Sequence, residues 1–518
     1  MSKERARELF LGLSVLFITS YAWMFSKVSV PNERTRAYLT VAIVDHGSLA
    51  IDEPIKRFGA VYDLAAFGGH YYTDKAPGSS LLGVPIYAAV RLFTAAQDWD
   101  IVGISNLLRT YLMLPFGLLG FLLLRWLLGR LGVSESARDL AALGFSLGSP
   151  VLHYSNAFYG HVLVATLVLA CLCCLARAGV LGPEAHGGRR WLLAAGGCAG
   201  LAGLVEYQAI ALAALLGIPL CFAPRRQIAR NVASYVAGAL PFAAALLWYD
   251  ARAFGGPFEL SYQHLVGSSL QELHGFGLAG ATIPTREALH AMATSPHRGL
   301  LVTAPLLGFG LCALPLLKRR LGTALWLSCL AGSAYFVLIV ASSSVWFGGW
   351  SFGLRLLIPI YGLLALAAAA GFDALASFPA LQVMLRAAAI YALVYQQLVQ
   401  LGFPELPPEF SSPLPDAILP LYRAGYVAPN LACKLGGLGL WNVLGVMPVS
   451  AALIVVLAMS GKGALRSRLA YGLSALLLAA AALSSLARSD ISIPPAAQAR
   501  WVKQVQAWTA AEERCSRR

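Results

Sequence analysis

Charged residues are scarce in this chain. They make up 12% of the 518 residues, about half the share that is usual in a soluble domain. Hydrophobic residues reach 58%, and the mean hydropathy is +0.67. A soluble fold of this size does not need so apolar a surface, and a disordered chain needs the opposite composition. The composition therefore excludes a cytosolic enzyme and a disordered protein, and it predicts an all-α polytopic membrane protein.

Cysteine patterns and internal repeats are also missing. None of the nine cysteines has the spacing of a zinc site. Seven of them lie inside apolar runs and behave as small hydrophobic residues, which leaves Cys433 and Cys515 outside. We expect these two to be unpaired thiols, and a disulfide between them is the alternative. No repeat of the kind that many transporters carry is visible, so we expect one integrated membrane domain.

Long apolar runs recur along the whole chain. We predict thirteen membrane spans near residues 9–26, 103–128, 139–154, 158–177, 191–205, 207–223, 231–250, 299–317, 322–342, 354–375, 379–398, 437–459 and 467–487. The first run follows a basic segment, Met1 to Glu8, and no small-residue cleavage site follows it. We therefore expect a retained first helix rather than a removed signal peptide.

Basic residues set the expected orientation. Lys and Arg exceed Asp and Glu by 39 to 25, a net charge of +14. In a soluble protein this excess would suggest nucleic acid, but here we predict no nucleic-acid partner, because basic residues keep membrane-protein loops in the cytoplasm. With the N-terminus inside, the Lys and Arg clusters fall into the predicted cytoplasmic loops, around residues 3–7, 125–138, 177–190, 225–230, 318–320 and 462–468. A crossing by the apolar run 80–96 would reverse this pattern, so we predict that it lies along the outer membrane face.

This parity divides the chain into a membrane domain, residues 1–487, and a short outer tail, residues 488–518. It also leaves a long first outer loop over residues 26–101. Within this loop, Pro31 makes Asn32 the expected N-cap of a helix over 33–45, which Gly47 ends. Glu33 would then lie in the first turn at the membrane surface. Its simplest role there is to complement the helix dipole.

Further along the loop, the segment 63–78 is aromatic, polar and rich in glycine. It contains Asp74 and Lys75, an adjacent acid–base pair. A lysine here can neutralise a phosphate as a point charge. The alternative is a surface salt bridge, which contributes little. His70 stands alone, which favours packing or hydrogen bonding over metal binding.

These two motifs resemble the first loop of the GT-C superfamily of integral membrane glycosyltransferases. The resemblance is strongest to the branch with lipid A aminoarabinose transferases and protein O-mannosyltransferases. The acidic pair that opens the loop in that branch aligns with Asn32-Glu33, and its aromatic-Glu-Lys-Pro-Pro-type motif aligns with Tyr72-Thr73-Asp74-Lys75-Ala76-Pro77. The motifs cover about 60 residues, whereas the topology, thirteen spans with two juxtamembrane helices in the first loop, matches over nearly the whole chain.

The resemblance implies an enzyme that moves a hexose or pentose from a polyprenyl-phosphate donor to a glycan, glycolipid or protein on the extracytoplasmic face, with inversion. It implies a bacterial inner membrane, with the active site facing the periplasm. Asn32 stands where the family has its usual catalytic Asp and cannot act as a base. The role therefore passes to the neighbouring Glu33, with Asp74 as the second catalytic carboxylate.

Three cations are the expected ligands of the donor phosphate, namely Lys75, Arg355 and Arg298. Arg355 begins an apolar span on the side where orientation requires no cation, and glycines precede it. The residues expected to bind substrate are Asn32, Asp63, His70, Tyr72, Glu206, Tyr207 and Trp350. A carboxylate between two spans, as at Glu206, is costly unless it is paired or functional. Trp350 also suits a membrane interface.

Three further expectations complete the analysis. The segment 249–263 is typical of an outer lid in such enzymes. No cofactor is required, although a divalent cation, Mg or Mn, could bind near Glu33 and Asp74 without a strong ligand cluster to demand it. Two other functions use the same features, a lipid-linked-sugar flippase or transporter and a non-catalytic protein of envelope assembly. The long acidic first loop favours the enzyme.

Overall fold

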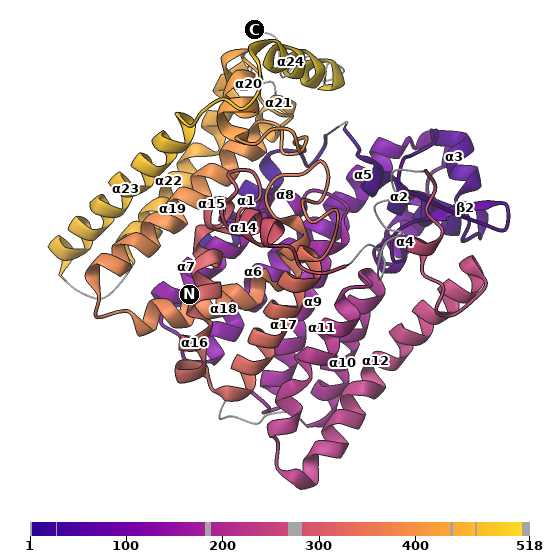
Figure 1. Cartoon of the computed structure of the whole chain (residues 1–518), viewed down its shortest axis with the longest axis horizontal. Coiled ribbons are helices and arrows are strands. Elements are labelled where there is room, and N and C mark those ends of the chain that lie inside the picture. The colour runs from indigo at the N-terminus through magenta and orange to yellow at the C-terminus, as the bar shows by residue number, and fades with distance from the viewer. Residues whose placement is uncertain are drawn as a thin grey trace.

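The computed structural model describes residues 3–26, 28–181, 188–267, 282–435, 439–460 and 464–509. These residues form a helical protein with one two-stranded sheet (Figure 1). Helices α10 and α12 extend to the bottom of Figure 1. The elements of the first loop group at the upper right, and α20, α21 and α24 lie at the top.

The first third of the chain contains α1 (Lys3–Tyr21), α2 (Pro31–His46), α3 (Asp52–Phe58), β1 (Leu64–Phe67), β2 (His70–Thr73), α4 (Gly78–Arg91), η1 (Ala96–Asp98), α5 (Ile101–Leu108), η2 (Arg109–Met113), α6 (Leu114–Arg130), α7 (Glu135–Ser146), α8 (Val151–Tyr154) and α9 (Gly160–Arg177). The middle contains α10 (Arg189–Val205), α11 (Ala209–Leu216), η3 (Ile218–Phe222), α12 (Arg225–Phe254), η4 (Ser261–Gln263), α14 (Arg286–Thr294), α15 (Leu300–Thr303), α16 (Pro305–Leu321) and α17 (Thr323–Ala341). The last part contains η5 (Arg355–Leu357), α18 (Ile358–Ala374), α19 (Pro379–Leu401), η6 (Leu414–Ile418), α20 (Leu419–Arg423), α21 (Leu431–Lys434), η7 (Gly439–Gly445), α22 (Met447–Met459), α23 (Leu465–Ala487) and α24 (Pro495–Thr509).

Six helices within the described residues are long and apolar enough to cross a membrane. They are Ile101–Arg130, Gly160–Arg177, Arg225–Phe254, Thr323–Ala341, Arg355–Ala374 and Leu465–Ala487. Helical segments also occupy the other predicted spans, but they are shorter, less apolar or interrupted. The span expected over 139–154, for example, is divided between α7 and α8. A multi-pass membrane protein is therefore supported, while the count of thirteen crossings stays a prediction.

Contacts between helix ends follow the predicted alternation of the chain. The beginning of α1, the end of α6 and the beginning of α7 meet where Asp139 accepts hydrogen bonds from Arg7 and Arg125. On the other side, Ala22 pairs with Asn430 just beyond the end of α1. We call this second side the loop side, because α2, α3, α4 and the β hairpin lie on it.

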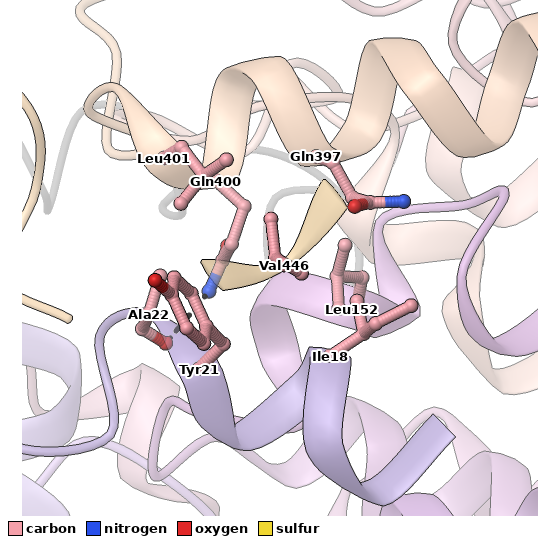
Figure 2. Close-up of a pocket in the computed structure, with 8 residues that line it drawn as sticks. All are labelled: Ile18, Tyr21, Ala22, Leu152, Gln397, Gln400, Leu401 and Val446. Carbon is pink, nitrogen blue, oxygen red and sulfur yellow. Dashed lines mark hydrogen bonds between the residues drawn. The ribbon is translucent and has the colours of Figure 1, made fainter. Parts of the chain in front are cut away.

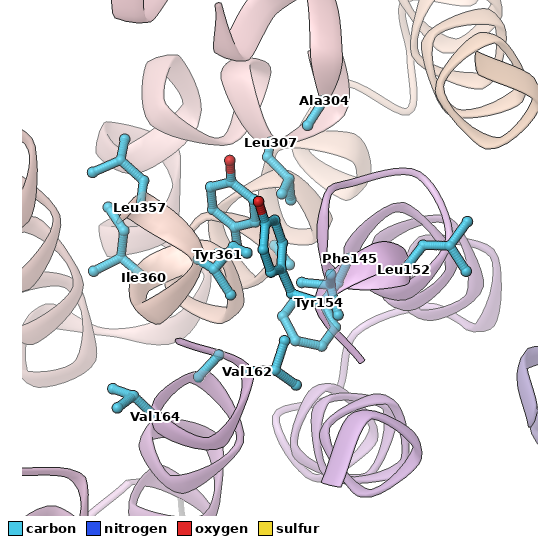
Figure 3. Close-up of a cluster of buried hydrophobic side chains, with 14 of the residues drawn as sticks. Phe145, Leu152, Tyr154, Val162, Val164, Ala304, Leu307, Leu357, Ile360 and Tyr361 are labelled. Atoms are coloured by element: carbon cyan, nitrogen blue, oxygen red, sulfur yellow. The ribbon is translucent and has the colours of Figure 1, made fainter. Parts of the chain in front are cut away.

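The core on the loop side is built from tyrosines as well as aliphatic residues. Tyr154 and Tyr361 are fully buried and lie next to each other, with their hydroxyl groups directed the same way (Figure 3). The Tyr361 hydroxyl donates to Leu354 O at 3.0 Å. The Tyr154 hydroxyl is buried without a hydrogen-bond partner in the structure. The apolar core therefore ends at buried tyrosine hydroxyl groups on the loop side.

Helix α2 confirms the expected helix of the first loop but corrects its beginning. Val30, not Asn32, is the N-cap, and no side chain caps this end. Pro31 takes the first helical position, because its fixed φ suits that position and its missing N–H costs nothing there. Gly47 ends the helix with φ 60°, as predicted.

The segment expected only as an aromatic, glycine-rich loop contains a β hairpin. Strands β1 and β2 pair antiparallel, with Phe67 opposite His70. The turn consists of Gly68 and Gly69, whose φ angles are 59° and 84°. Two positive φ values are what a two-residue hairpin turn requires, and glycine adopts them without strain. The hairpin leads directly into Asp74 and Lys75.

Helix α4 replaces the expected surface helix over 80–96 and begins against the end of α10. A Cβ atom at Gly78 would lie 2.6 Å from the backbone of Leu204 and Val205. No side chain fits at this contact, so glycine lets the two backbones touch. The contact brings the Asp74-Lys75 motif close to Glu206, which follows α10.

Helix α24, the last of the described residues, lies on the loop side. Asp416 accepts hydrogen bonds from the Ser492 amide at 2.7 Å and from the Ser492 hydroxyl, and Gln498 donates to Pro415 O at 3.1 Å. Cys433 is disulfide-bonded, so the expectation of an unpaired thiol at this position is wrong. Cys515 lies outside the described residues.

Candidate active site

Lys75 lies between two carboxylates of the first loop. Its Nζ is 2.5 Å from Asp74 Oδ2 and 3.1 Å from Asp63 Oδ2. Burial lowers the pKa of Lys75, but Asp63 and Asp74 outweigh it and hold the pKa above its ordinary value. The lysine is therefore a permanent, largely enclosed positive charge. The structure brings together three residues that the sequence analysis selected.

Asp74 has one carboxylate oxygen that is free to accept a hydrogen bond. It is buried, and its Oδ1 has no hydrogen-bond partner in the structure. Burial raises the pKa of Asp74 to about 6, although Lys75 lowers it, and Asp63 adds to the rise. A carboxylate with a free oxygen and a pKa near neutrality has the properties of a general base or acid.

The predicted lid segment covers this motif. The Ser261 hydroxyl donates to Asp74 O at 2.7 Å. The next residues run along β1, where Ala66 N donates to His264 O at 2.8 Å and Val266 N donates to Leu64 O at 2.9 Å. Residues 268–281, which continue from this segment, lie outside the described residues. Asp74 is thus closed off from one side by a segment that both hydrogen bonds and aromatic packing, such as that of Tyr262 on Tyr207, hold in place.

A second ion pair joins α2 to the end of α10. Arg36 is buried and donates to Glu206 Oε1 at 2.7 Å, to Ser79 Oγ at 2.6 Å and to Asn32 Oδ1 at 3.2 Å. His161 lies 3.9 Å from the same Glu206 oxygen. Asn32 and Glu206, both expected to bind substrate, thus converge on an arginine that the sequence analysis did not select.

Glu33 is fully buried and paired with Arg109. Its Oε1 accepts from Arg109 Nε at 2.6 Å and from the Phe158 amide at 2.8 Å, and its Oε2 accepts from Arg109 Nη2. Arg109 also donates to Val28 O at 2.9 Å. Both Glu33 oxygens are therefore engaged by partners that tie α2 to η2 and to the segment before α9.

Arg355 faces the first loop from the beginning of η5. Its guanidinium lies 5.0 Å from the centre of the Tyr159 ring, and its Nε is buried without a hydrogen-bond partner in the structure. The charges of Asp63 and Glu405 both act on it. Arg355, Arg36 and Lys75 all act electrostatically on His161. Three cations from three parts of the chain are thus within electrostatic range of the same histidine.

Arg298, the third predicted phosphate ligand, is used differently. It is buried, and it donates to Ser351 O, to Ser351 Oγ at 2.9 Å and to Gly349 O at 2.8 Å. His297 Nε2 lies 2.9 Å from the same Ser351 O. Burial lowers the pKa of Arg298 below its ordinary value. Its hydrogen bonds hold the loop that precedes Arg355.

A buried polar chain lies behind this loop. His153 Nε2 is 2.8 Å from Glu405 Oε1, and His153 Nδ1 is 3.2 Å from Gln400 Oε1. Glu405 Oε2 has no hydrogen-bond partner in the structure. Gln400 also lines a small pocket with Tyr21, Ala22 and other residues at the end of α1 (Figure 2). This pocket lies on the far side of His153 from Glu405.

Other predicted substrate-binding residues lie around the cluster or away from it. Tyr207 is buried, lies 5.6 Å from the Tyr262 ring and donates to Asp250 at 3.3 Å. Tyr72 packs edge-on against Phe254. His70 is exposed beside the hairpin turn and pairs with Asp52 at 3.0 Å, outside the cluster. Trp350 is also exposed, and its ring contacts Trp501 and Trp508.

The sequence analysis missed four residues that the structure places at the site. Two of them, Arg109 and His161, are ionisable residues inside apolar helices, a pattern that marks functional or paired groups. That pattern was applied to Glu206 and could have selected these two as well. Arg36 lies in the polar helix α2, where an arginine is not unusual. Glu405 stands in a proline-rich outer segment, and nothing local distinguishes it.

The site has no fit for the divalent cation that the sequence analysis allowed. Among the described residues, no group of three or more His, Cys, Asp or Glu side chains is arranged to hold a metal ion. Lys75 fills the position between Asp63 and Asp74, and Arg109 takes both oxygens of Glu33. Built-in cations therefore already neutralise the carboxylates that a metal would use.

Comparisons with known proteins place the fold. No family model matches the chain, and no curated protein matches it in sequence. Among solved structures, ArnT from Cupriavidus metallidurans in the apo state superposes with a TM-score of 0.51 at 14% identity, over 94% of this chain and 78% of ArnT. The apo oligosaccharyltransferase of Archaeoglobus fulgidus superposes with a TM-score of 0.50 at 13% identity, over 77% of this chain and 56% of that enzyme.

Both proteins are glycosyltransferases of the GT-C superfamily. ArnT has also been solved with undecaprenyl phosphate bound, and that structure superposes with a TM-score of 0.47. At these identities the likeness concerns the fold, and the shared fold agrees with the motif resemblance of the first loop. This chain therefore has the fold of the GT-C membrane glycosyltransferases.

Proposed function

We propose that this protein transfers a sugar from a polyprenyl-phosphate donor to an acceptor hydroxyl at the loop side, with inversion at the anomeric carbon. One observation carries the proposal. Lys75 pairs with a buried carboxylate, Asp74, that has one oxygen without a partner, and Arg355, from a distant part of the chain, is within electrostatic range of Asp63, the other partner of Lys75. Two cations and a base are what this reaction needs from a protein.

The two cations act on the leaving group. As the bond between the anomeric carbon and the phosphate oxygen breaks, negative charge grows on the polyprenyl phosphate. Lys75 is held charged by Asp63 and Asp74, and the Nε of Arg355 has no internal partner. Both can therefore bind the phosphate and stabilise the charge that develops on it.

Asp74 is the carboxylate that we assign as the base. The acceptor hydroxyl attacks the anomeric carbon and passes its proton to Asp74 Oδ1, the oxygen without a partner. The sequence argument gave this role to Glu33. The contacts of Glu33 with Arg109 and the Phe158 amide support a positioning role instead, because they fix α2 under the site. Reaching Asp74 requires the segment 261–266 to move aside.

Arg298 has a supporting role in this scheme. Its guanidinium is occupied by the carbonyls of Gly349 and Ser351. It therefore orders the loop that leads to Arg355 instead of contacting the phosphate itself. Residues beside the cations, among them Glu206, Tyr207 and Tyr72, then surround the transferred sugar.

The location of the donor follows from the same geometry. Nucleotide sugars are cytoplasmic, whereas a lipid-linked donor can enter sideways from the bilayer between apolar helices. We propose that the loop side faces the periplasm across a bacterial inner membrane, as the basic loops indicate. The sugar, hexose or pentose, and the acceptor then decide the biological product.

Release of free polyprenyl phosphate from a synthetic polyprenyl-phosphate sugar by the purified protein is the test. Active protein in detergent should release it when acceptor extract is present, and Lys75→Ala should abolish most of the release. A flippase or a non-catalytic assembly protein releases none under any condition. Lys56→Ala is a matched control, because Lys56 is an exposed lysine of the same loop that pairs only with Glu53.

A further inference from the structure

An aromatic surface on the loop side lies outside the chemistry described so far. Trp350 and Trp508 are 44% and 39% exposed, although both are large apolar side chains. Their ring centroids are 5.8 Å apart and the rings are inclined at 52°. They come from the loop before Arg355 and from α24, the last helix of the described residues. We call this pair the tryptophan platform.

The platform rests on a rigid aromatic base. Trp501 is buried and contacts both exposed rings, with ring centroids 6.4 Å from Trp350 and 6.2 Å from Trp508. Beneath it, Phe403 lies 5.3 Å from Trp501 and Phe410 lies 5.0 Å from it. Stacked and edge-on rings of this kind fix one another in place. The exposed pair is therefore held in one orientation rather than left as two mobile side chains.

The backbone around Trp350 is fixed by a buried arginine, whose burial costs free energy. The carbonyls of its two neighbours, Gly349 and Ser351, accept hydrogen bonds from the buried guanidinium of Arg298. The Ser351 amide donates to Leu406 O at 3.0 Å. A buried arginine that has only carbonyl and hydroxyl partners is expensive. These hydrogen bonds fix the backbone on both sides of Trp350 and so give its exposed ring a defined position.

The platform is continuous with the proposed active site. Gly348, two residues before Trp350, approaches Arg355 so closely that a Cβ atom there would lie 3.0 Å from Arg355 Nε. Phe403 also packs edge-on against Trp23, which packs against His153, the partner of Glu405. Arg355 is five positions after Trp350, which limits their separation to about 17 Å of extended chain.

Helix α24 has a polar outer face, which argues against insertion of the platform into lipid. Its exposed residues include Arg500, Lys503 and Gln504, and Gln504 lies one turn before Trp508. An aromatic pair that inserts into a bilayer needs apolar neighbours, whereas a sugar needs an aromatic face with hydrogen-bonding groups at its edge. The C–H face of a pyranose ring is apolar and slightly positive, so it suits the negative face of an indole.

We propose that the tryptophan platform binds the acceptor, and that this acceptor is an oligosaccharide chain. Sugar rings stack on Trp350 and Trp508, while the end of the same chain reaches the region of Arg355 and Asp74. A single sugar cannot span both places, so the platform selects a chain of several sugars. The proposal rests on the proposed function, because it names the acceptor class of the same site.

The test measures binding and transfer separately in the purified full-length protein. Cellohexaose, maltohexaose and chitohexaose serve as probes in calorimetric titrations, because stacking on indole tolerates differences between sugars. Wild-type protein should bind at least one hexamer and bind its monosaccharide far more weakly. Trp350→Ala and Trp508→Ala should each weaken hexamer binding about tenfold or more. Trp248→Ala is the matched control, since Trp248 is an exposed tryptophan of α12 far along the chain from the platform, and it should change nothing.

The transfer assay separates the possible failures. In both platform variants the KM for acceptor should rise about tenfold, while the KM for the polyprenyl-phosphate donor and kcat stay within about twofold. No hexamer binding by the wild-type protein overturns the proposal, as does equal binding by wild type and Trp350→Ala. Loss of vesicle association without loss of hexamer binding also overturns it and assigns the pair to the membrane interface. Absence of donor cleavage with intact hexamer binding overturns the proposed function instead.

Discussion

Replacing Asp74 by asparagine separates a catalytic carboxylate from a structural one. Asn keeps the size and most of the hydrogen bonding of Asp but cannot take a proton. A general base contributes about 10²–10⁴-fold to rate, so kcat of Asp74→Asn should fall by about that factor. The Asp74 side chain bonds to Lys75, and its Oδ1 is unpartnered, so the variant should still fold.

The pH dependence of the rate provides a second, quantitative test of the role of Asp74. Burial raises the pKa of Asp74 to about 6, and a base works only in its ionised form. Between pH 7 and pH 5 the ionised fraction then falls about tenfold, and the rate should fall with it. An aspartate with the ordinary pKa of 3.8 would stay almost fully ionised over that range. The wild-type profile should therefore show a limb near pH 6 that is absent from the residual activity of Asp74→Asn.

Asp63→Asn is the matched control for this experiment. Asp63 also pairs with Lys75, so the variant removes a similar charge from the same lysine. It should keep the acidic limb and most of kcat, and the limb should move to slightly lower pH, because Asp63 helps to raise the pKa of Asp74. The measurement is single-turnover release of polyprenyl phosphate from pH 5 to 8. A flat wild-type profile, or an active Asp74→Asn, would refute the assignment and return the role to Glu33.

Four further outcomes follow from the contacts. Glu33→Gln and Arg109→Met should each lower the thermal midpoint of the purified protein. Each variant leaves its partner's charge buried and unpaired, at a cost of about 3–5 kcal/mol. A stable, inactive Glu33→Gln would instead support catalysis by Glu33. Arg355→Ala should weaken donor binding by about 1.5–3 kcal/mol, the contribution of a charge-assisted hydrogen bond. Arg355→Lys should recover only part of this loss, because lysine lacks the forked geometry of the guanidinium group. An unchanged KM for the donor in both variants would show that Arg355 does not bind the phosphate. A cysteine introduced at Ser48 should react with a membrane-impermeant reagent in intact cells, and labelling only after lysis would reverse the topology. A non-reducing peptide map should find Cys433 in a cross-linked peptide, and a free thiol there would contradict the structure.

The membrane fold could be predicted from the sequence because its signals are local. Apolar runs fix the helices, and the Lys and Arg clusters fix which ends meet. Even the motif that leads to Lys75 could be selected from residues within one segment. The local errors are small and have local causes. Pro31 prefers the first helical position and so makes Val30 the N-cap in place of Asn32.

The pairing of charges could not be predicted in the same way. Glu33 meets Arg109 across 76 residues, and His153 meets Glu405 across 252. Sequence spacing does not indicate such contacts, because they arise only when distant segments pack together. Glu33 therefore looked like an available base at the membrane surface until its partner was known.

Four arginines at the loop side, three of them buried and Arg355 half-buried, illustrate how the partner decides the role. Arg36 and Arg109 each meet a carboxylate, Glu206 and Glu33 respectively, so their charge is already compensated inside the protein. Arg298 donates to backbone carbonyls and a hydroxyl, and Arg355 lies over the Tyr159 ring with its Nε unbonded. A cation that is largely withdrawn from water costs free energy unless an anion or a set of hydrogen-bond acceptors compensates it. On this reasoning we propose that Arg355 binds the donor phosphate, that Arg298 holds the loop beside it, and that the two paired arginines stabilise the elements that carry the site.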